Sequence, residues 1–239
     1  MKSTYNLQQL ESPEPVETRV YTQIRQAIMQ GQLQPGERLV LDRLAASLGV
    51  SRVPVTQALK RLETQGFVRT ARRGETVVVE LSVTDAWELY VLRIRLQPLA
   101  ARYAAQRLQP DQLAEIERLA ECVAPLSGAE RTVMDRRFHE AIANASGMPR
   151  LVQILNNLWD VTEVYRAAKD TKEQDLTDTI ENNAKSRREH EAMLAALRQG
   201  DGEAAEAVER AHLVRVTKLV FRALGQSIPI AESEINNLK

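Results

Sequence analysis

The sequence of 239 residues is poor in cysteine and in aromatic residues, and it contains no long apolar run. Its single cysteine, Cys122, has no partner for a disulfide within the chain, which fits a reducing compartment. Residues 1–15 lack the apolar segment of a signal peptide, and no stretch approaches the length that spans a membrane. These absences exclude a disulfide scaffold and a membrane-spanning protein. They predict a soluble, cytoplasmic protein.

Glycine and proline are also scarce, with 10 and 9 residues, and aromatic residues make up only 4% of the chain. This composition favours helices over sheets. The formal net charge is zero, but residues 1–80 hold 11 Lys and Arg against 8 Asp and Glu, whereas residues 81–239 hold 21 against 24. The length suits two domains. The uneven charge fits nucleic-acid binding by the N-terminal part alone.

Region 16–80 has the pattern of a winged helix-turn-helix. Apolar residues recur at helical spacing in its first part, and the pattern changes to alternation beyond Gly66. The expected elements are helices over 17–30, over 42–48 and from residue 52 onward, followed by strands over 67–70 and 76–79. Because Arg72 and Arg73 fall at the tip of this hairpin, we expect them to reach DNA phosphates or the minor groove.

The third helix of this region has two different faces. Ser51 is a good N-cap, because its hydroxyl can accept an orphan backbone N–H. The apolar face consists of Val55, Ala58, Leu59 and Leu62. The opposite face mixes cations, amides and a hydroxyl, which suits the DNA major groove, whereas taken alone it also fits an ordinary solvated face. The residues predicted to bind DNA are Ser51, Arg52, Val53, Thr56, Gln57, Lys60, Arg72 and Arg73.

Beyond a short linker at 81–84, residues 85–225 show helical periodicity almost throughout. The fold class expected for the whole chain is therefore mostly α, a winged helix-turn-helix followed by an all-α bundle. Residues 1–15 and 226–239 are expected to be tails. The helices expected after the first long one run over 110–123, 129–145, 149–168, 180–198 and 203–224.

All three histidines of the chain fit one geometric scheme with Asp135. His139 lies four residues after Asp135, so the two side chains share a helix face. His190 lies 11 residues before Asp201 and His212 lies 11 residues after it, and Asp201 sits in a glycine-flanked break. If the break forms an antiparallel helical hairpin, the two imidazoles lie level. The four residues are then predicted to converge as a metal site in the bundle core, the alternative being three solitary histidines.

The ligand types leave the identity of the metal open. Three imidazoles and one carboxylate suit zinc, nickel, manganese or iron. With neutral histidines and an ionised aspartate, a divalent ion would leave the site with a charge of about +1. This charge favours an anionic effector.

The N-terminal region resembles the GntR family of bacterial transcription regulators across residues 16–79. The residues that carry the resemblance are Ile28, Gly31, Pro35-Gly36, Leu44-Ala45, Gly49-Val50-Ser51-Arg52, Pro54-Val55, Ala58-Leu59, Leu62-Glu63 and Gly66. Thr56 replaces the arginine usual after the Pro-Val pair, and Leu41 replaces a usual acidic residue. The resemblance implies that Arg52 contacts DNA. Thr56 and Gln57 imply a base preference that differs from the common operator of the family.

Residues 84–224 resemble the FCD effector domain, which marks the FadR-type subfamily. The resemblance rests on the pattern around Arg93 and on Asp135-Arg136-Arg137-Phe138-His139, Glu189-His190 and His212. It implies that Asp135, His139, His190 and His212 hold a divalent metal, that a small carboxylate effector completes the coordination, and that Arg93 assists. A structural ion pair is the alternative role for Arg93. Gln97 and Met148 depart from the usual glutamate and asparagine.

The leading hypothesis is a homodimeric transcription regulator, with repression more usual in the family than activation. Two winged helices would bind the half-sites of a near-palindromic double-stranded operator, and a small organic acid in the helical domain would change DNA affinity. Two other classes remain open. One is a metal-dependent enzyme acting on a small organic acid, because such a centre can activate water. The other is a DNA-binding dimer without a ligand response.

Overall fold

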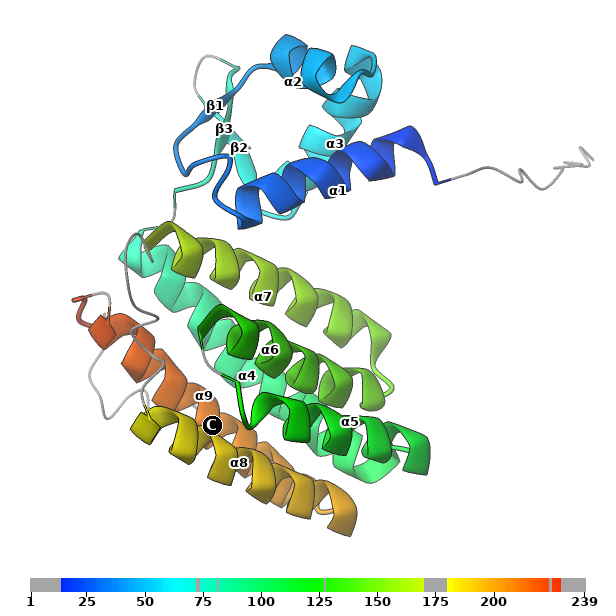
Figure 1. Ribbon diagram of the computed structural model, residues 1–239, viewed down its shortest axis with the longest axis vertical. Coiled ribbons are helices and arrows are strands. Elements are labelled where there is room, and N and C mark those ends of the chain that lie inside the picture. The colour runs from blue at the N-terminus through cyan, green and yellow to red at the C-terminus, as the bar shows by residue number, and fades with distance from the viewer. Residues whose placement is uncertain are drawn as a thin grey trace, which may run out of the picture. The chain divides into compact units, whose positions relative to one another are not determined.

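The computed structural model describes residues 14–71, 74–80, 82–126, 128–169, 180–223 and 225–228, and the predicted tails lie almost entirely outside them. The chain divides into two compact units, with the boundary between Glu80 and Leu81 (Figure 1). Within the described residues, the N-terminal unit combines three helices with a small sheet, and the second unit contains six helices. None of the described helices is long and apolar enough to cross a membrane.

The N-terminal unit is a winged helix-turn-helix. Its elements are α1 (Val16–Met29), β1 (Arg38–Leu39), α2 (Leu41–Leu48), α3 (Arg52–Thr64), β2 (Val68–Thr70) and β3 (Thr76–Val78). The three strands form an antiparallel sheet in the order β1-β3-β2. Strand β1 was not predicted, because two residues are too few to show the alternation that identifies a strand. The predicted hairpin is present as β2 and β3.

The apolar face of α3 forms the core of this unit. Val55, Ala58, Leu59 and Leu62 are all buried, as the helical spacing predicts, and α3 packs against α1. Gly49 ends α2 with a φ of 64°, a left-handed conformation that glycine adopts without strain. Ser51 occupies the N-cap of α3, but its side chain makes no capping hydrogen bond. The capping hydrogen bond predicted for the Ser51 hydroxyl is therefore wrong.

The second unit is a bundle of α-helices. They are α4 (Val83–Arg107), α5 (Pro110–Val123), α6 (Gly128–Ala145), α7 (Pro149–Lys169), α8 (Ile180–Gln199) and α9 (Gly202–Ala223). Helix α4 begins inside the linker expected at 81–84, because Ser82 and Asp85 form a capping box. The Ser82 hydroxyl accepts from the backbone N–H of Asp85 at 3.1 Å, and the Asp85 carboxylate accepts from that of Ser82 at 2.8 Å.

Helix α4 is the central element of the bundle and packs against α6, α7, α8 and α9. Its buried positions at Ala100, Ala101 and Ala104 are small, so neighbouring helices approach it closely. Larger side chains, including Phe138 of α6 and Leu155 of α7, fill the space around these alanines. The core therefore holds α6, α7, α8 and α9 around one helix, and this arrangement positions the side chains described below.

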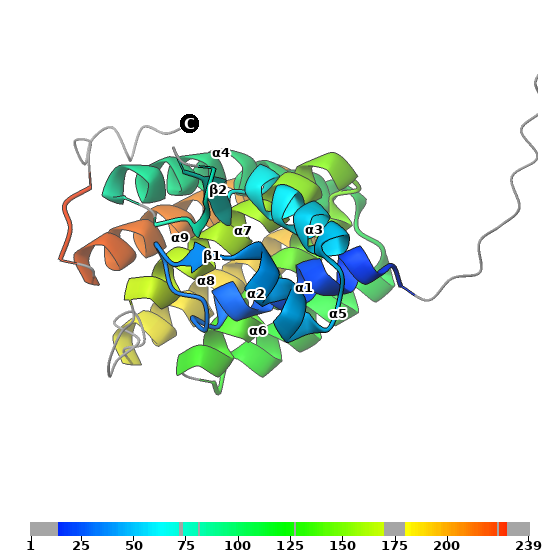
Figure 2. The same ribbon diagram turned by 90° about the horizontal axis from the view of Figure 1, so that it is seen from above.

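A tight turn joins α8 and α9, which lie side by side in both views (Figures 1 and 2). Gly200 ends α8 with a φ of 66°, and the backbone N–H of Asp201 donates to the carbonyl of Ala196 at 3.0 Å. The Asp201 carboxylate then caps α9 by accepting from the backbone N–H groups of Glu203 and Ala204. The chain thus reverses as an antiparallel helical hairpin, as the glycine-flanked break predicts.

Gly202→Ala should destabilise the protein. A Cβ at this position would lie 2.9 Å from the backbone oxygen of Arg102 and 2.8 Å from Nε2 of Gln106, both on α4. The glutamine can move, but the carbonyl can move only if the two helices separate. We expect the free energy of unfolding to fall by about 1–3 kcal/mol in denaturant titrations, the usual cost of overpacking. Glu203→Ala, on the exposed side of the same turn, should change it by roughly 0.5 kcal/mol or less. Equal stability of Gly202→Ala and the parent would contradict the close approach.

Candidate metal centre and nucleic-acid interface

Asp135, His139, His190 and His212 lie together in the helical bundle. Two of them come from α6, one from α8 and one from α9, and the four potential ligand atoms lie within 4.8 Å of one another. Nε2 of His190 lies 3.2 Å from one carboxylate oxygen of Asp135, and Nε2 of His139 lies 3.8 Å from the other. The three histidines are about 5% exposed, so the cluster is closed to bulk water except at Asp135. The four side chains therefore converge, as their spacing in the sequence predicts. Their role as metal ligands stays a prediction.

Two glutamates contact the histidine rings from outside the cluster. Oε1 of Glu209 lies 3.0 Å from Nδ1 of His139, and Oε2 of Glu189 lies 2.6 Å from Nδ1 of His212. An ionised carboxylate only accepts hydrogen bonds, so Nδ1 of His212 carries the proton. The His212 ring therefore has its lone pair on Nε2, whereas Nδ1 of His139 lies close to Glu209 without a hydrogen bond of acceptable geometry. Carboxylates hold metal-ligating histidines in this way in known metal sites.

A chain of polar contacts extends from His139 across the core to α7. The amide Nε2 of Gln97 donates to Glu209, and the indole Nε1 of Trp159 donates to the Gln97 carbonyl oxygen at 3.0 Å. Gln97 and Glu209 are both buried, with 3% and 2% exposure. The amide of Gln97 is thus fixed in one orientation, with its oxygen toward Trp159. The helices α4, α6, α7 and α9 are joined through this chain.

The carboxylates around the histidines are ionised. Burial raises the pKa of the Glu209 carboxyl, but the adjacent His139 outweighs it and the pKa falls to about 2. At Glu189, burial likewise raises the pKa of the carboxyl, but the hydrogen bonds with His212 and Arg215 outweigh burial, and this pKa also falls to about 2. At Asp135, burial raises the pKa of the carboxyl, but the hydrogen bond with His190 and the charges of the histidines lower it more, so this pKa lies well below the usual range. Burial lowers the pKa of His190, which favours the neutral, metal-binding form.

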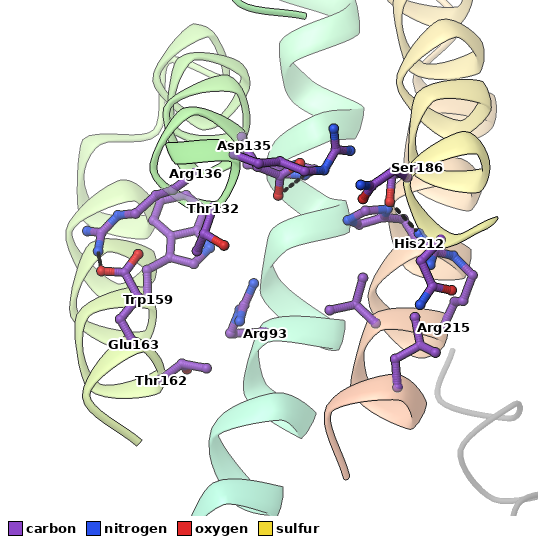
Figure 3. Close-up of a pocket in the computed structure, with 16 residues that line it drawn as sticks. Arg93, Thr132, Asp135, Arg136, Trp159, Thr162, Glu163, Ser186, His212 and Arg215 are labelled. Carbon is purple, nitrogen blue, oxygen red and sulfur yellow. Dashed lines mark hydrogen bonds and ion pairs between the residues drawn. The ribbon is translucent and has the colours of Figure 1, made fainter. Parts of the chain in front are cut away.

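A cavity of about 110 Å³ adjoins the cluster, and Arg93, Asp135, His139 and His212 are among its lining residues. Figure 3 shows Arg93 and Asp135 between Trp159 and Glu163 on one side and His212 and Arg215 on the other. Arg215 holds Glu189 with two hydrogen bonds of 2.5 and 2.6 Å. The guanidinium carbon of Arg93 also lies 5.3 Å from the centroid of the Tyr90 ring. The structure therefore places Arg93 in the cavity beside the cluster, and its contact with an effector stays a prediction.

The residues present fit a divalent metal. Nε2 of His139 and Nε2 of His190 are buried, and neither makes a hydrogen bond of acceptable geometry within the described part of the chain. Buried nitrogens of this kind normally have a partner. Together with one carboxylate oxygen and the ring of His212, they make a nitrogen-rich donor set suited to a first-row transition metal.

The sequence interpretation missed Glu209, Glu189 and Trp159 as parts of this site. A signal for Glu209 existed, because it lies three residues before His212 and so shares its face of α9. Glu189 was noted only as the neighbour of His190, although it contacts His212. No local pattern identifies Trp159, since its contact with Gln97 joins residues 62 positions apart.

The predicted DNA-binding residues of α3 form an exposed surface. Ser51, Arg52, Val53, Thr56, Gln57 and Lys60 are all exposed. Arg52 forms an ion pair with Asp42 of α2, including a hydrogen bond of 2.7 Å, and the Thr56 hydroxyl donates to the Arg52 carbonyl at 2.9 Å. Arg72 and Arg73 lie outside the described residues. The α3 side chains are therefore accessible to a DNA groove, and their contacts with bases or phosphates stay predictions.

A groove beside this surface separates α3 from the sheet. Its lining includes Arg38 of β1, Thr56 and Lys60 of α3, and Thr70 of β2. Glu63 of α3 accepts a hydrogen bond of 2.8 Å from the backbone N–H of Thr70, which ties the hairpin to the helix. The position of the wing relative to α3 is thus set within the unit itself.

Comparisons with known proteins assign both units. Residues 17–78 match the bacterial regulatory proteins of the gntR family, and residues 88–215 match the FCD domain. The chain is 27% identical over 208 residues to the HTH-type transcriptional regulator YdhC of Bacillus subtilis, covering 85% of this chain and 90% of the relative. It is 29% identical over 194 residues to the regulator McbR of Escherichia coli, covering 77% and 83%.

Two further comparisons agree with this assignment. The gluconate operon transcriptional repressor of Bacillus licheniformis is 27% identical over 192 residues, covering 77% of this chain and 76% of the relative. The solved structure of Escherichia coli McbR/YncC superposes with a TM-score of 0.69 at 26% identity and covers 88% of this chain and 99% of that one. The chain accordingly belongs to the GntR family of bacterial transcription regulators, as a FadR-type member with an FCD domain.

Proposed function

We propose that this regulator is a repressor whose operator affinity changes when a small carboxylate binds beside a metal in the helical unit. The observation that carries the proposal is the convergence of Asp135, His139, His190 and His212 next to a cavity that contains Arg93. A repressor is favoured over an activator because a relative is named as the gluconate operon repressor.

Asp135, His139, His190 and His212 would hold the metal, and Glu209 and Glu189 would keep the histidine rings in place. The bound ion would supply a positive charge that attracts one carboxylate of the effector. Arg93 adds a second positive charge at the same cavity. Because the donor atoms come from three helices, loading the site links α6, α8 and α9.

The polar chain through Gln97 gives a route from the site to the DNA-binding unit. Gln97 lies on α4, and α4 begins at Val83, a few residues after β3. A shift of α4 on effector binding would therefore act directly on the segment that leads into the winged helix. The effector changes DNA affinity only if it binds one arrangement of the two units better than the other.

We further propose that the protein acts as a homodimer on a near-palindromic operator. A single α3 reads only one short half-site in the major groove. A two-fold dimer presents two such helices, which matches the symmetry of a palindromic sequence.

Selection from a random duplex library by the full-length, zinc-loaded protein tests the proposal. We expect the enriched sequences to contain two inverted half-sites. Adding a panel of small organic acids should then identify at least one that changes operator affinity by roughly 5- to 150-fold, the usual range of allosteric coupling. Chelation should remove this response and leave DNA binding largely intact. If all acids leave DNA affinity unchanged, the effector proposal is wrong. Enriched sequences without inverted half-sites would refute the dimeric arrangement.

A further inference from the structure

We infer that the effector is a short dicarboxylate, with one carboxylate at the histidine cluster and the second beside Arg131. This inference rests on the proposed function and deepens it, because it names the number of anionic groups and the residue that recognises the second one. Its basis is a buried guanidinium in the wall of the same cavity.

Arg131 lies on the same stripe of α6 as two residues of the cluster. Arg131, Asp135 and His139 are spaced four residues apart, so all three side chains project from one face of the helix. Each step of four residues advances about 6 Å along the helix axis. All three line the cavity. A ligand that reaches from the cluster to Arg131 thus needs its anionic groups separated by only a few bonds.

Arg131 is a buried cation without a carboxylate partner within the described residues. It is 8% exposed, and its Nη1 donates to the backbone carbonyl of Val123 at the end of α5, at 3.0 Å. That carbonyl carries only part of a negative charge. Two other arginines that line the cavity differ: Arg136 contacts Glu140, Asp160 and Glu163, and Arg215 contacts Glu189. A carboxylate of the ligand would compensate the charge that Arg131 brings into the bundle.

The remaining walls limit the size of the ligand. The apolar side chains of Val216 and Leu219 on α9 and the ring of Trp159 on α7 line the cavity, while Asn182 and Asn183 of α8 add amide groups. An engineered cavity of about 150 Å³ holds benzene. The cavity of about 110 Å³ therefore suits a compact ligand of a few carbon atoms.

Isothermal titration of full-length, zinc-loaded protein with succinate and with propionate tests the inference. These probes share a carboxylate and a short carbon chain, and only succinate has a second carboxylate. The parent should bind succinate roughly 10- to 100-fold more tightly, which is the effect of one charge-assisted hydrogen-bonded pair. Arg131→Gln should reduce succinate affinity to the level of propionate and leave zinc content and propionate affinity unchanged. Arg131→Lys should retain part of the preference for succinate.

Arg187→Gln is the matched control. Arg187 also donates to a carbonyl at the end of α5, that of Ala124 at 2.8 Å, but it is exposed and does not line the cavity. This variant should keep the full preference for succinate. Equal binding of both acids by the parent, or a preference that survives in Arg131→Gln, would overturn the inference while leaving the metal and monocarboxylate proposal intact. Failure of the zinc-loaded parent to bind either acid would overturn both.

Discussion

His190→Ala and His212→Ala should each lose most of the metal that the parent protein retains. Purified without chelator, the parent should hold close to one divalent ion per chain, bound by the four clustered residues. Removing one of four ligands leaves an incomplete donor set. Both imidazoles are buried, so a water molecule that replaced the lost ring as a ligand would have few other hydrogen-bond partners. Elemental analysis of the purified variants measures the loss. Full metal content in both variants would exclude this set of ligands.

The same variants should lose the stabilisation that the metal provides. An ion present at 100 times its dissociation constant stabilises the folded state by about 2.7 kcal/mol, or roughly 5–10 °C in Tm for a protein of this size. Truncating a buried ring also creates a cavity, so Tm alone does not separate the two effects. Chelation should lower the Tm of the parent and leave that of His190→Ala nearly unchanged. Glu191→Ala, the exposed neighbour on α8, should behave as the parent does.

Most of the geometry of the cluster of Asp135 and the three histidines was predictable because it is local. Asp135 and His139 are one helical turn apart, and His190 and His212 are symmetric about a turn whose glycines the sequence displays. The turn forms as predicted, and the ring centroids of these two histidines lie 5.8 Å apart. Only the meeting of α6 with the α8–α9 hairpin required tertiary structure, and resemblance to the FCD domain supplied that.

Most of the supporting contacts were not predictable, because they are long-range. Gln97 and Glu209 are 112 residues apart, and they meet only because α4 packs along α9. Arg131 has no motif either, since nothing in the sequence indicates that a cation at this position is buried against the end of α5. Single-sequence patterns give the period of each helix, but the partner of each face depends on how the helices pack.

In the N-terminal unit, the burial of α3 was predictable and its polar details were not. The spacing of Val55, Ala58, Leu59 and Leu62 identifies the buried face, because only one face of an amphipathic helix can enter a core. The pairing of Arg52 with Asp42 joins two helices across a turn and leaves no periodic signal. This pair bears directly on the prediction that Arg52 contacts DNA.

Arg52→Ala should weaken operator binding by about 1–3 kcal/mol, or roughly 5- to 150-fold in Kd. Arg52 begins α3, and its side chain is 68% exposed, so the guanidinium can reach a guanine edge or a phosphate. In the free protein it pairs with Asp42, whose side chain is 60% exposed. An exposed ion pair contributes only about 0–1 kcal/mol, so DNA can displace Asp42 at little cost. Asp42→Ala should accordingly bind the operator at least as tightly as the parent.

Arg61→Ala provides a control with the same change in charge on the same helix. Arg61 lies on the side of α3 that faces α1, where its guanidinium carbon is 3.9 Å from the centroid of the Tyr21 ring. Its loss should leave operator affinity close to that of the parent in fluorescence anisotropy at fixed salt. If Arg52→Ala and Arg61→Ala weaken binding equally, the effect is one of net charge, and Arg52 makes no specific contact. A Kd for Arg52→Ala equal to that of the parent would remove Arg52 from the DNA interface, since the ion pair with Asp42 would then be its whole role.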